Sequence, residues 1–451
     1  MQSITIPKAA KSSRRSNLIV LSLFLASLLC IATFSANGTE GQEQCVATTH
    51  TDASNSSDQA ALDLRILAND FPALHALTDS MQACAPDNIN IVAEHTREYR
   101  QLQIPALQQS PSAFDVVMTG NNAIVPLLND GLLQPLDDLL DKFAPNLPAT
   151  QKVRFNGQTM AVALLANAQH LFYRQDLLQK AGLKPPETIE ELLSACTVLK
   201  EAGVEHPFAA SFKAGWDLGL EFINFYIGNG GGFTSNDTNS GSTLIAIDTN
   251  VAKKALHNMK SLTSCMTPDF LSRGINEVQA SWQGGNHAIA TLWGSRATAI
   301  LADTTTLEQV RQSTVLGGGL KTNADTDDST GVASTLWWVG FALPKTVSKE
   351  HAEAAMKLMF DKTMTHVIDN HSNKAVWLIN GYQPDQNAVG VSKTVKDKAT
   401  AYPSNATINL LHEAAGQELT DFLKGKESAD VALQDLLASY RSKAAAAGFS
   451  E

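Results

Sequence analysis

The chain has 451 residues, of which 44% are hydrophobic and 18% are charged, and its formal net charge at pH 7 is −11. This composition is typical of a globular protein and excludes a disordered chain. The acidic balance argues against binding to nucleic acid or to an anionic membrane surface, because both are polyanions. The length is sufficient for two domains of ordinary size.

Residues 1–36 are predicted to be a signal peptide. Four basic residues precede the apolar run "LIVLSLFLASLLCIATFSA", which ends in small residues as secretory signals do. Two alternatives stay open: a retained membrane anchor, because the run approaches the length that spans a bilayer, and a lipoprotein signal with Cys30 as the lipidated residue. Loss of the four basic residues changes the net charge from −11 to about −15. We expect the mature protein in the periplasm or another extracytoplasmic space.

Strands and helices alternate from residue 62 onward. "LDLRILA" alternates apolar and polar residues as a strand does, and a helix is predicted over 72–84, with Pro72 in its first turn. Further strands are predicted at 88–96 and 114–120, so the pattern indicates βαβ units and a mainly parallel sheet. Ligands of such sheets bind beyond the carboxyl ends of the strands. The polar residues at these ends are Asn69, Asp70, Asn121 and Asn122. An alternative role for Asp70 is to cap the following helix.

A second α/β unit is predicted to begin with "FYRQDLLQKAGLKPPETIEELL", residues 172–193. Gly182 ends a short helix, and Thr188 with Glu191 forms a capping box for the next one. We place the passage between the two units at about residues 161–169. A later strand ends at Trp293, another carries Trp337 and Trp338, and the C-terminus is predicted to form two helices with a break at Gly425.

Motifs for cofactors, metals and catalysis are missing from the sequence. No dinucleotide-binding or P-loop glycine pattern and no Cys/His cluster with zinc spacing occurs. "LHEAAGQ" lacks the second His of a metalloprotease motif, and no GxSxG motif is present. We therefore expect neither cofactor nor metal. A secreted glycoside hydrolase with two facing carboxyl groups stays open as a possibility, because spacing alone does not exclude it.

Four segments in a fixed order carry a family resemblance. They are "FDVVMTG…LLNDGLLQPLDDLL", "GQTMAVALLANAQHLFYRQDLLQKAGLKPPETIEELL", "WQGGNHAIATLWGS" and "GFALPK…AEAAMKLMFDK". The chain resembles the extracellular solute-binding proteins of ABC transporters, within the carbohydrate-binding, maltose-binding-protein-like family. The resemblance implies an α/β fold of two Rossmann-like lobes joined by hinge strands, a type II periplasmic-binding-protein fold with a ligand cleft and no catalysis. We expect residues 60–163 with 340–385 in lobe one and residues 166–335 with 390–451 in lobe two.

The same resemblance implies a function in solute uptake. The protein is expected to capture a sugar or oligosaccharide and to deliver it, as a monomer, to the permease subunits of an ABC importer by hinge closure. Two alternatives stay open. In the first, a protein of the same fold binds a glycerol phosphodiester or a polyamine instead of a sugar. In the second, the protein is a sensory binding protein.

The candidate ligand-binding residues follow from the chemistry of a sugar. Aromatic rings stack on its apolar faces, and carboxylates, amides and Arg bind its hydroxyl groups. The candidates are Asn69, Asp70, Asn121, Asn122, Trp216, Asp217, Trp293, Arg296, Trp337, Trp338 and Trp377. Each Trp has core packing as its alternative, and strand alternation allows only one of Trp337 and Trp338 to face the cleft. The resemblance places Trp293 at a position that commonly contacts ligand. Because Arg296 is the single cation among the candidates, a neutral sugar is expected.

Four cysteines follow the leader, and an even number in an exported chain indicates disulfides. Cys45 and Cys84 flank the first strand and helix, whereas Cys196 and Cys265 lie on helices of the second lobe. Bridges within lobes leave the hinge free, so we predict the pairs Cys45–Cys84 and Cys196–Cys265. Buried free thiols are the alternative.

Overall fold

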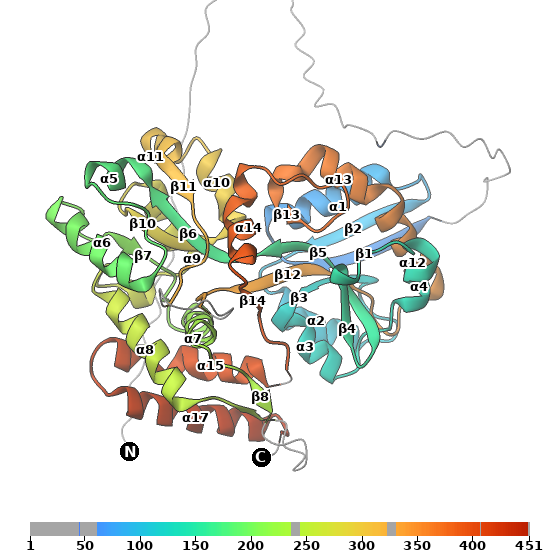
Figure 1. The fold of residues 1–451 in the computed structure, drawn as a ribbon. Helices are drawn as coiled ribbons and strands as arrows, with labels where there is room; N and C mark the ends of the chain where they lie inside the picture. Colours follow the sequence, from blue (N-terminus) through green and yellow to red (C-terminus); the bar gives the residue numbers. More distant parts are fainter. Residues whose placement is uncertain (1–44, 46–60, 236–243, 323–330, 406, 450–451) are drawn as a thin grey trace, which may run out of the picture. The chain divides into compact units, whose positions relative to one another are not determined.

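The computed structural model describes residue 45 and residues 61–235, 244–322, 331–405 and 407–449 (Figure 1). The predicted signal peptide lies outside these residues. Within them, no helix has the length and apolar character needed to cross a membrane. The described residues form one compact unit that contains two separate main sheets. The predicted boundaries of the two lobes stay a prediction.

The larger sheet has eight strands in the order β13-β5-β12-β3-β1-β2, with β4 beside β5 and β14 beside β12. The strands are β1 Leu62–Ala68, β2 Ile89–His95, β3 Val116–Gly120, β4 Lys152–Phe155, β5 Gln158–Asn167, β12 Thr335–Ala342, β13 Val376–Trp377 and β14 Thr400–Ala401. β1 runs parallel to β2 and β3, but β12 runs antiparallel to β3 and β5. The prediction of a mainly parallel sheet is therefore wrong, and the sheet is mixed. β12 first pairs with β3 at the end of that strand and runs back along it in the opposite direction.

Helices cover both faces of the eight-stranded sheet, because successive residues of its strands point to opposite sides. Leu64 and Ile66 of β1 pack into one core with α1 and α12, whereas Leu67 packs into another core with α2 and α3. The helices associated with this sheet are α1 Pro72–Cys84, α2 Tyr99–Leu107, α3 Asn121–Asn129, α4 Asp137–Phe143, α12 Lys349–Leu358 and α13 Met364–His371, with a π-helical turn at Met359–Thr363.

The smaller sheet has four strands in the order β11-β6-β10-β7. They are β6 Gln169–Arg174, β7 Phe208–Ala209, β10 Ile289–Trp293 and β11 Thr314–Leu316, and β8 Thr234–Ser235 pairs separately with β9 Ile245–Ala246. Its helices are α5 Gln175–Lys180, α6 Ile189–Glu201, α7 Trp216–Gly228, α8 Thr249–Thr263, α9 Ile275–Gln283, α10 Ala297–Leu301 and α11 Glu308–Ser313. Leu171 and Phe172 point into the two different cores on the two faces of this sheet.

The chain passes from the larger to the smaller sheet within one residue. β5 ends at Asn167, Ala168 is fully buried, and β6 begins at Gln169. The chain returns between β11 and β12, and it leaves again after β13 toward α14 Val389–Lys396, which contacts β6. The passage from one α/β unit to the next therefore lies at the position that the sequence predicts.

The C-terminal segment packs against the helices of the smaller sheet. Its helices are α15 Ile408–Glu418, α16 Thr420–Leu423 and α17 Ala429–Ala446, of which α15 contacts α7 and α17 contacts α8 (Figure 1). The predicted break at Gly425 is confirmed, since that residue has φ +76° after α16. Gly416 allows α15 to lie directly on α7, because a Cβ there would be 2.1 Å from the carbonyl oxygen of Gly215.

Local signals also set the boundaries of individual helices. The predicted capping box at the start of α6 is present: the Thr188 side chain accepts from the N–H of Glu191, whose side chain accepts from the N–H of Thr188. Such a cap contributes about 1 kcal/mol. Asp70 does not cap α1, because Phe71 is its N-cap residue and no side chain bonds there. The alternative role proposed for Asp70 is therefore wrong.

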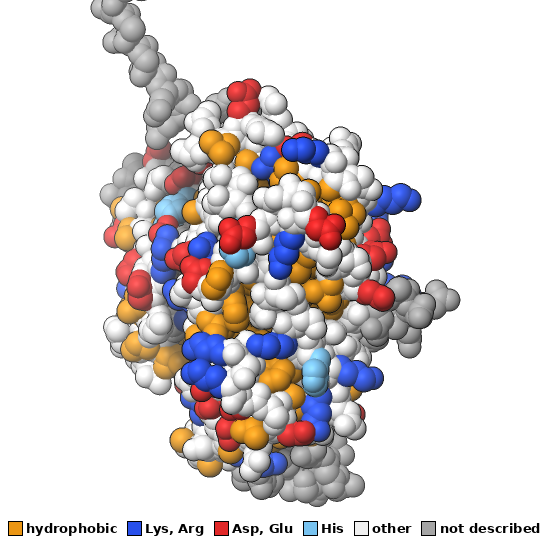
Figure 2. Space-filling model, turned by 90° about the vertical axis from the view of Figure 1, so that its left-hand side faces the viewer, with side chains coloured by type: hydrophobic (Ala, Val, Ile, Leu, Met, Phe, Trp, Pro, Cys, Tyr) orange, Lys and Arg blue, Asp and Glu red, His pale blue; other side chains and the backbone are white. Residues whose placement is uncertain are grey.

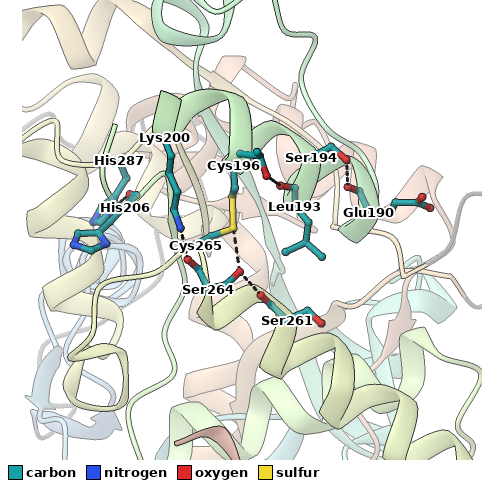
Figure 3. The surroundings of a disulfide bond; sticks show 11 residues. Glu190, Leu193, Ser194, Cys196, Lys200, His206, Ser261, Ser264, Cys265 and His287 are labelled. Carbon is teal, nitrogen blue, oxygen red and sulfur yellow. Dashed lines mark hydrogen bonds between the residues drawn. A yellow bond between two sulfur atoms is a disulfide. The ribbon is translucent and has the colours of Figure 1, made fainter. Parts of the chain in front are cut away.

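Both predicted disulfides are present. Cys45 pairs with Cys84, and Cys196 pairs with Cys265, with Cα atoms 5.2 Å and 6.0 Å apart. The second bridge joins α6 to the second residue after α8, and next to it Nζ of Lys200 donates to the carbonyl oxygen of Ser264 (Figure 3). Each bridge closes within the packing of a single sheet, so neither crosses the passage between the two sheets.

Candidate functional site

Trp337 is the central ring of an aromatic cluster where the two sheets meet. Its ring centroid lies 5.8 Å from that of Trp216 and 5.6 Å from that of Trp293, both edge-on, and 4.3 Å from that of Tyr402. These residues come from the start of α7, the end of β10, the start of β12 and the segment after β14. Trp216 is 37% exposed, whereas Trp337 is 8% exposed. Trp216 is therefore the accessible ring of the pair, and Trp337 packs beneath the neighbouring rings.

His412 of α15 forms a hydrogen bond with the backbone of Trp216. Its Nε2 lies 2.7 Å from the carbonyl oxygen of Trp216, and its Nδ1 lies 2.7 Å from the hydroxyl of Tyr402. Since a carbonyl only accepts, Nε2 carries the proton and Nδ1 accepts from Tyr402. Burial lowers the pKa of His412 to about 4, so the imidazole is neutral at physiological pH. The backbone also favours this arrangement, because Gly215, with φ +100°, turns the chain into Trp216.

A pocket of about 200 Å³ opens beside Trp216. One side comes from α2 and α3 of the larger sheet, and the other side comes from Trp216 and α15. The lining residues are Arg100, Gln103, Ile104, Asn122, Ala123, Pro126, Leu127, Trp216, Asn409, His412 and Glu413. The guanidinium carbon of Arg100 lies 5.6 Å from the centroid of the Trp216 ring. The pocket thus combines an aromatic face with amide and charged groups, and this mixture suits a polyhydroxylated ring.

Two amide oxygens of this pocket have no hydrogen-bond partner. Nδ2 of Asn409 donates to the backbone oxygen of Asn122 at 2.9 Å, which fixes the orientation of the Asn409 amide. The Oδ1 atoms of Asn409 and Asn122 are buried and unbonded. A buried acceptor without a donor costs about 1–3 kcal/mol.

Asn121, by contrast, is occupied by the backbone. Its Nδ2 donates to the carbonyl oxygens of Leu336 and Tyr402, and its Oδ1 accepts from the N–H of Trp338 at 2.7 Å. These bonds hold the start of β12 and the segment after β14 against α3. Asn121 therefore builds the site and has no polar atom left for a ligand.

Asp217 and Arg296 lie on the side of the smaller sheet. Asp217 accepts from the N–H of Ile275 at the start of α9, and burial raises its pKa to about 6. Arg296 donates to Oε1 of Gln279 at 2.9 Å, and burial lowers its pKa. Neither residue lines the pocket beside Trp216.

Asn69 and Asp70 also lie outside the lining of that pocket. Asp70 accepts from Nε2 of His75 at 2.9 Å, and His75 stacks on His95 with ring centroids 3.8 Å apart. The hydrogen bond from His75 lowers the pKa of Asp70. Both residues follow β1, so they stay predicted contacts at the edge of the sheet.

Trp338 and Trp377 point away from the aromatic cluster. Trp338 packs against the core beneath α2 and α3, on the opposite side of β12 from Trp337, as strand alternation requires. Trp377 is 2% exposed in the core on the other face of the larger sheet, and its Nε1 donates to the carbonyl oxygen of His371. We leave Trp377 out of the site for this reason.

The sequence profile of the bacterial extracellular solute-binding proteins matches residues 78–359. The chain belongs to this family. A curated relative, a putative binding protein of Brucella abortus, is 27% identical over 125 residues, which are 24% of this chain and 30% of that protein. The alignment thus spans less than a third of the relative.

Solved structures of solute-binding proteins share the fold. The maltose-bound MalE3 of T. maritima superposes with a TM-score of 0.67 at 17% identity, covering 84% of this chain and 99% of that one. An ABC transporter solute-binding protein of Agrobacterium vitis, with bound D-mannitol, gives a TM-score of 0.66 at 18% identity and covers 87% and 100% of the two chains. The predicted fold class is confirmed.

Several residues of the site in this solute-binding protein escape prediction from the sequence. Arg100, Asn409 and His412 line the pocket, and Tyr402 completes the aromatic cluster. The pattern HEAAG carries a usable signal, since a His and a Gly one helical turn apart on an apolar helix indicate close packing. That signal becomes meaningful only when α15 is known to lie on α7.

Another hollow among the described residues differs in its lining. It has a volume of about 500 Å³, is shallow, lies beside the Cys196–Cys265 bridge and is lined by Lys200, Gly203, Glu205, His206, Ser264 and Met266, without a Trp, Tyr or Phe side chain. On the face shown in Figure 2, acidic, basic and hydrophobic side chains are interspersed. Among the described residues, no group of three His, Cys, Asp or Glu side chains is placed to hold a metal ion.

Proposed function

We propose that this solute-binding protein captures a sugar or oligosaccharide outside the cytoplasm and delivers it to an ABC importer. The observation that carries the proposal is the pocket beside Trp216, in which an exposed indole face adjoins two buried amide oxygens without donors. Sugar rings present an apolar face for stacking and hydroxyl donors for such oxygens. The maltose and D-mannitol bound to proteins of the same fold support this class of ligand.

The site residues that we propose for direct contact are Trp216, Asn122, Asn409 and Arg100, with Trp293, Asp217 and Arg296 at the rim and Asn69 and Asp70 at the far edge. Trp337 supports the rings in contact. Because the pocket takes residues from helices of both sheets, a bound ligand would stabilise the arrangement in which these elements approach one another. Export through the signal peptide and action as a monomer are part of the same proposal.

A thermal-shift panel with calorimetric follow-up tests the ligand class. The panel contains maltose, maltotriose, D-mannitol, ribitol and N,N′-diacetylchitobiose, with glycerophosphocholine and putrescine representing the two other ligand classes. A rise in melting temperature and saturable binding with at least one sugar or polyol is the expected result. Saturable binding to glycerophosphocholine or putrescine, with none to the sugars and polyols, would replace the proposed class.

Two further measurements test the remaining parts of the proposal. Uptake of the labelled ligand by cells with and without the gene separates transport from sensing, because a sensory protein leaves uptake unchanged. Mass analysis of the exported protein should show loss of about 36 residues, as a cleaved signal predicts. Light scattering should give the mass of one chain.

A further inference from the structure

A buried row of hydrogen bonds runs from Trp337 to Gln169, which shares a cavity with Glu221. Nε1 of Trp337 donates to Oγ1 of Thr335 at 2.9 Å, and that hydroxyl donates to Oδ1 of Asn224 at 2.8 Å. Nδ2 of Asn224 donates to Oε1 of Gln169 at 3.0 Å, and Gln169 and Glu221 line the same small cavity. All five residues are buried. We call these five residues the relay.

The relay ends at a carboxyl group that no sugar reaches. Glu221 is 3% exposed, and its Oε1 has no hydrogen-bond partner. This carboxyl lines an enclosed cavity of about 10 Å³, together with Gln169 and Thr291. Such a volume has room for about one water molecule. Glu221 therefore acts on a ligand only through the residues between them.

Glu221 is the titratable member of the relay. Burial raises its pKa to about 8, and the negative charge of Asp217, four residues earlier on α7, adds to the rise, while the Gln169 side chain opposes it. The other side chains that line the cavity are uncharged. The carboxyl is thus protonated at neutral pH and ionises in mildly alkaline solution.

The relay also joins the two passages of the chain between the sheets. Gln169 is the first residue of β6, Thr335 is the first residue of β12, and Oγ of Ser334 donates to the carbonyl oxygen of Gln169 at 2.7 Å. At its other end, Trp337 lies edge-on against Trp216 and Trp293. The relay therefore extends from the cavity at Glu221 to the centre of the aromatic cluster.

We propose that Glu221 is a positioning residue of the binding site, whose carboxyl holds the orientation of the Trp337 indole through Gln169, Asn224 and Thr335. An ionised carboxylate accepts only, so its two oxygens both require donors, and the Gln169 amide is the neighbour that turns to supply them. The effect on ligand affinity rests on the proposed function. The effect on Trp337 does not.

Near-UV circular dichroism of the mature, ligand-free protein tests the proposal between about pH 6 and about pH 9, below the ionisation of tyrosine. The wild type should show a reversible change of the tryptophan signal with a midpoint near pH 8. Glu221→Gln, which keeps the shape of the side chain without its charge, should lose this change. Trp337→Phe should lose most of it.

Thr335→Val distinguishes an effect of Glu221 on the orientation of Trp337 from an effect of Glu221 on the stability of the protein. This substitution removes a hydrogen bond of the relay but leaves Glu221 able to ionise. The melting temperature should therefore still fall as pH rises, whereas the tryptophan circular dichroism should no longer change with pH. Asn224→Leu cuts the relay at another bond and should give the same result if Thr335→Val folds poorly. Thr363→Val is the matched control, since Thr363 is a fully buried residue whose hydroxyl bonds to Leu358 outside the relay. It should keep the wild-type change.

The proposal is overturned if the wild-type tryptophan signal is flat over this range. It is equally overturned if the change persists in Glu221→Gln, or in both Thr335→Val and Asn224→Leu. These measurements need no ligand, so they test the proposal even if no sugar of the panel binds. Conversely, a sugar that binds Glu221→Gln and the wild type with the same affinity at every pH would separate the relay from ligand binding.

Discussion

Nε2 of His412 donates to the carbonyl oxygen of Trp216 across 2.7 Å, so the C-terminal helix α15 holds the first residue of α7 in place. A Cβ on Gly219 would lie 2.2 Å from the carbonyl oxygen of His412, which shows how closely the two helices approach. Through this contact, residues almost 200 positions apart in the chain form one wall of the candidate site.

Trp216→Ala should weaken sugar binding strongly and leave the fold intact. Truncation of a central aromatic contact costs about 2–4 kcal/mol, which is roughly thirty- to a thousandfold in affinity. Trp216 is 37% exposed without ligand, so the melting temperature should change little. Calorimetry with the sugar identified by the panel measures the effect.

Trp377→Ala is the matched control for Trp216→Ala. Because its indole is 2% exposed in a core, stability should fall by about 3–5 kcal/mol while the folded fraction binds normally. Near-native affinity of Trp216→Ala would remove that residue from the site.

Asn122→Leu should lower affinity at least tenfold without lowering the stability of the free protein. The Oδ1 of Asn122 is buried without a donor, so replacing it by an apolar group of similar size removes an unsatisfied acceptor. Urea unfolding of the free protein and calorimetry with the sugar measure the two effects. Asn121→Leu should behave in the opposite way, because Asn121 makes three structural hydrogen bonds. Equal effects of the two substitutions would refute this division of roles.

His412→Gln should reduce the loss of stability in acid. The pKa of His412 is about 4 in the folded protein, below its unfolded value, so its share of stability is present above about pH 6.5 and is lost as pH falls through about 4. The share is on the order of 3 kcal/mol. Urea unfolding across this range measures it. His170, whose pKa is also about 4 and which lies away from the pocket, provides the comparison through His170→Gln. Only His412→Gln should also weaken sugar binding.

Removal of the Cys196–Cys265 bridge by substitution of both residues with Ser should cost about 2–4 kcal/mol of stability. The bridge closes a loop with a sequence separation of 69, and neither cysteine lines the pocket. Affinity for the sugar should therefore stay within a factor of about two. A large loss of affinity at unchanged stability would link this bridge to the site.

The periodicity of apolar residues, the positions of Gly and Pro, and the capping residues determined the elements and their order. The capping box at Thr188 and Glu191, the break at Gly425 and the passage near residues 161–169 all depend on neighbours within a few positions, and all are found as predicted. The pairing of the four cysteines was also accessible, since it follows from the order of the elements around them.

Only the tertiary structure decided which of the predicted polar and aromatic residues form the site. Asn121 and Asn122 are adjacent and chemically identical, yet one is consumed by backbone groups of β12 and the other keeps a free oxygen in the pocket. From the sequence, Trp216 and Trp377 are both candidates for stacking on a sugar. In the structure, Trp216 is exposed beside α15, whereas Trp377 is buried in a core. A side chain's type and local pattern determine what it is able to bind. Its availability depends on which distant segments pack against it, and those contacts, such as the one between His412 and Trp216, are set by the fold of the whole chain.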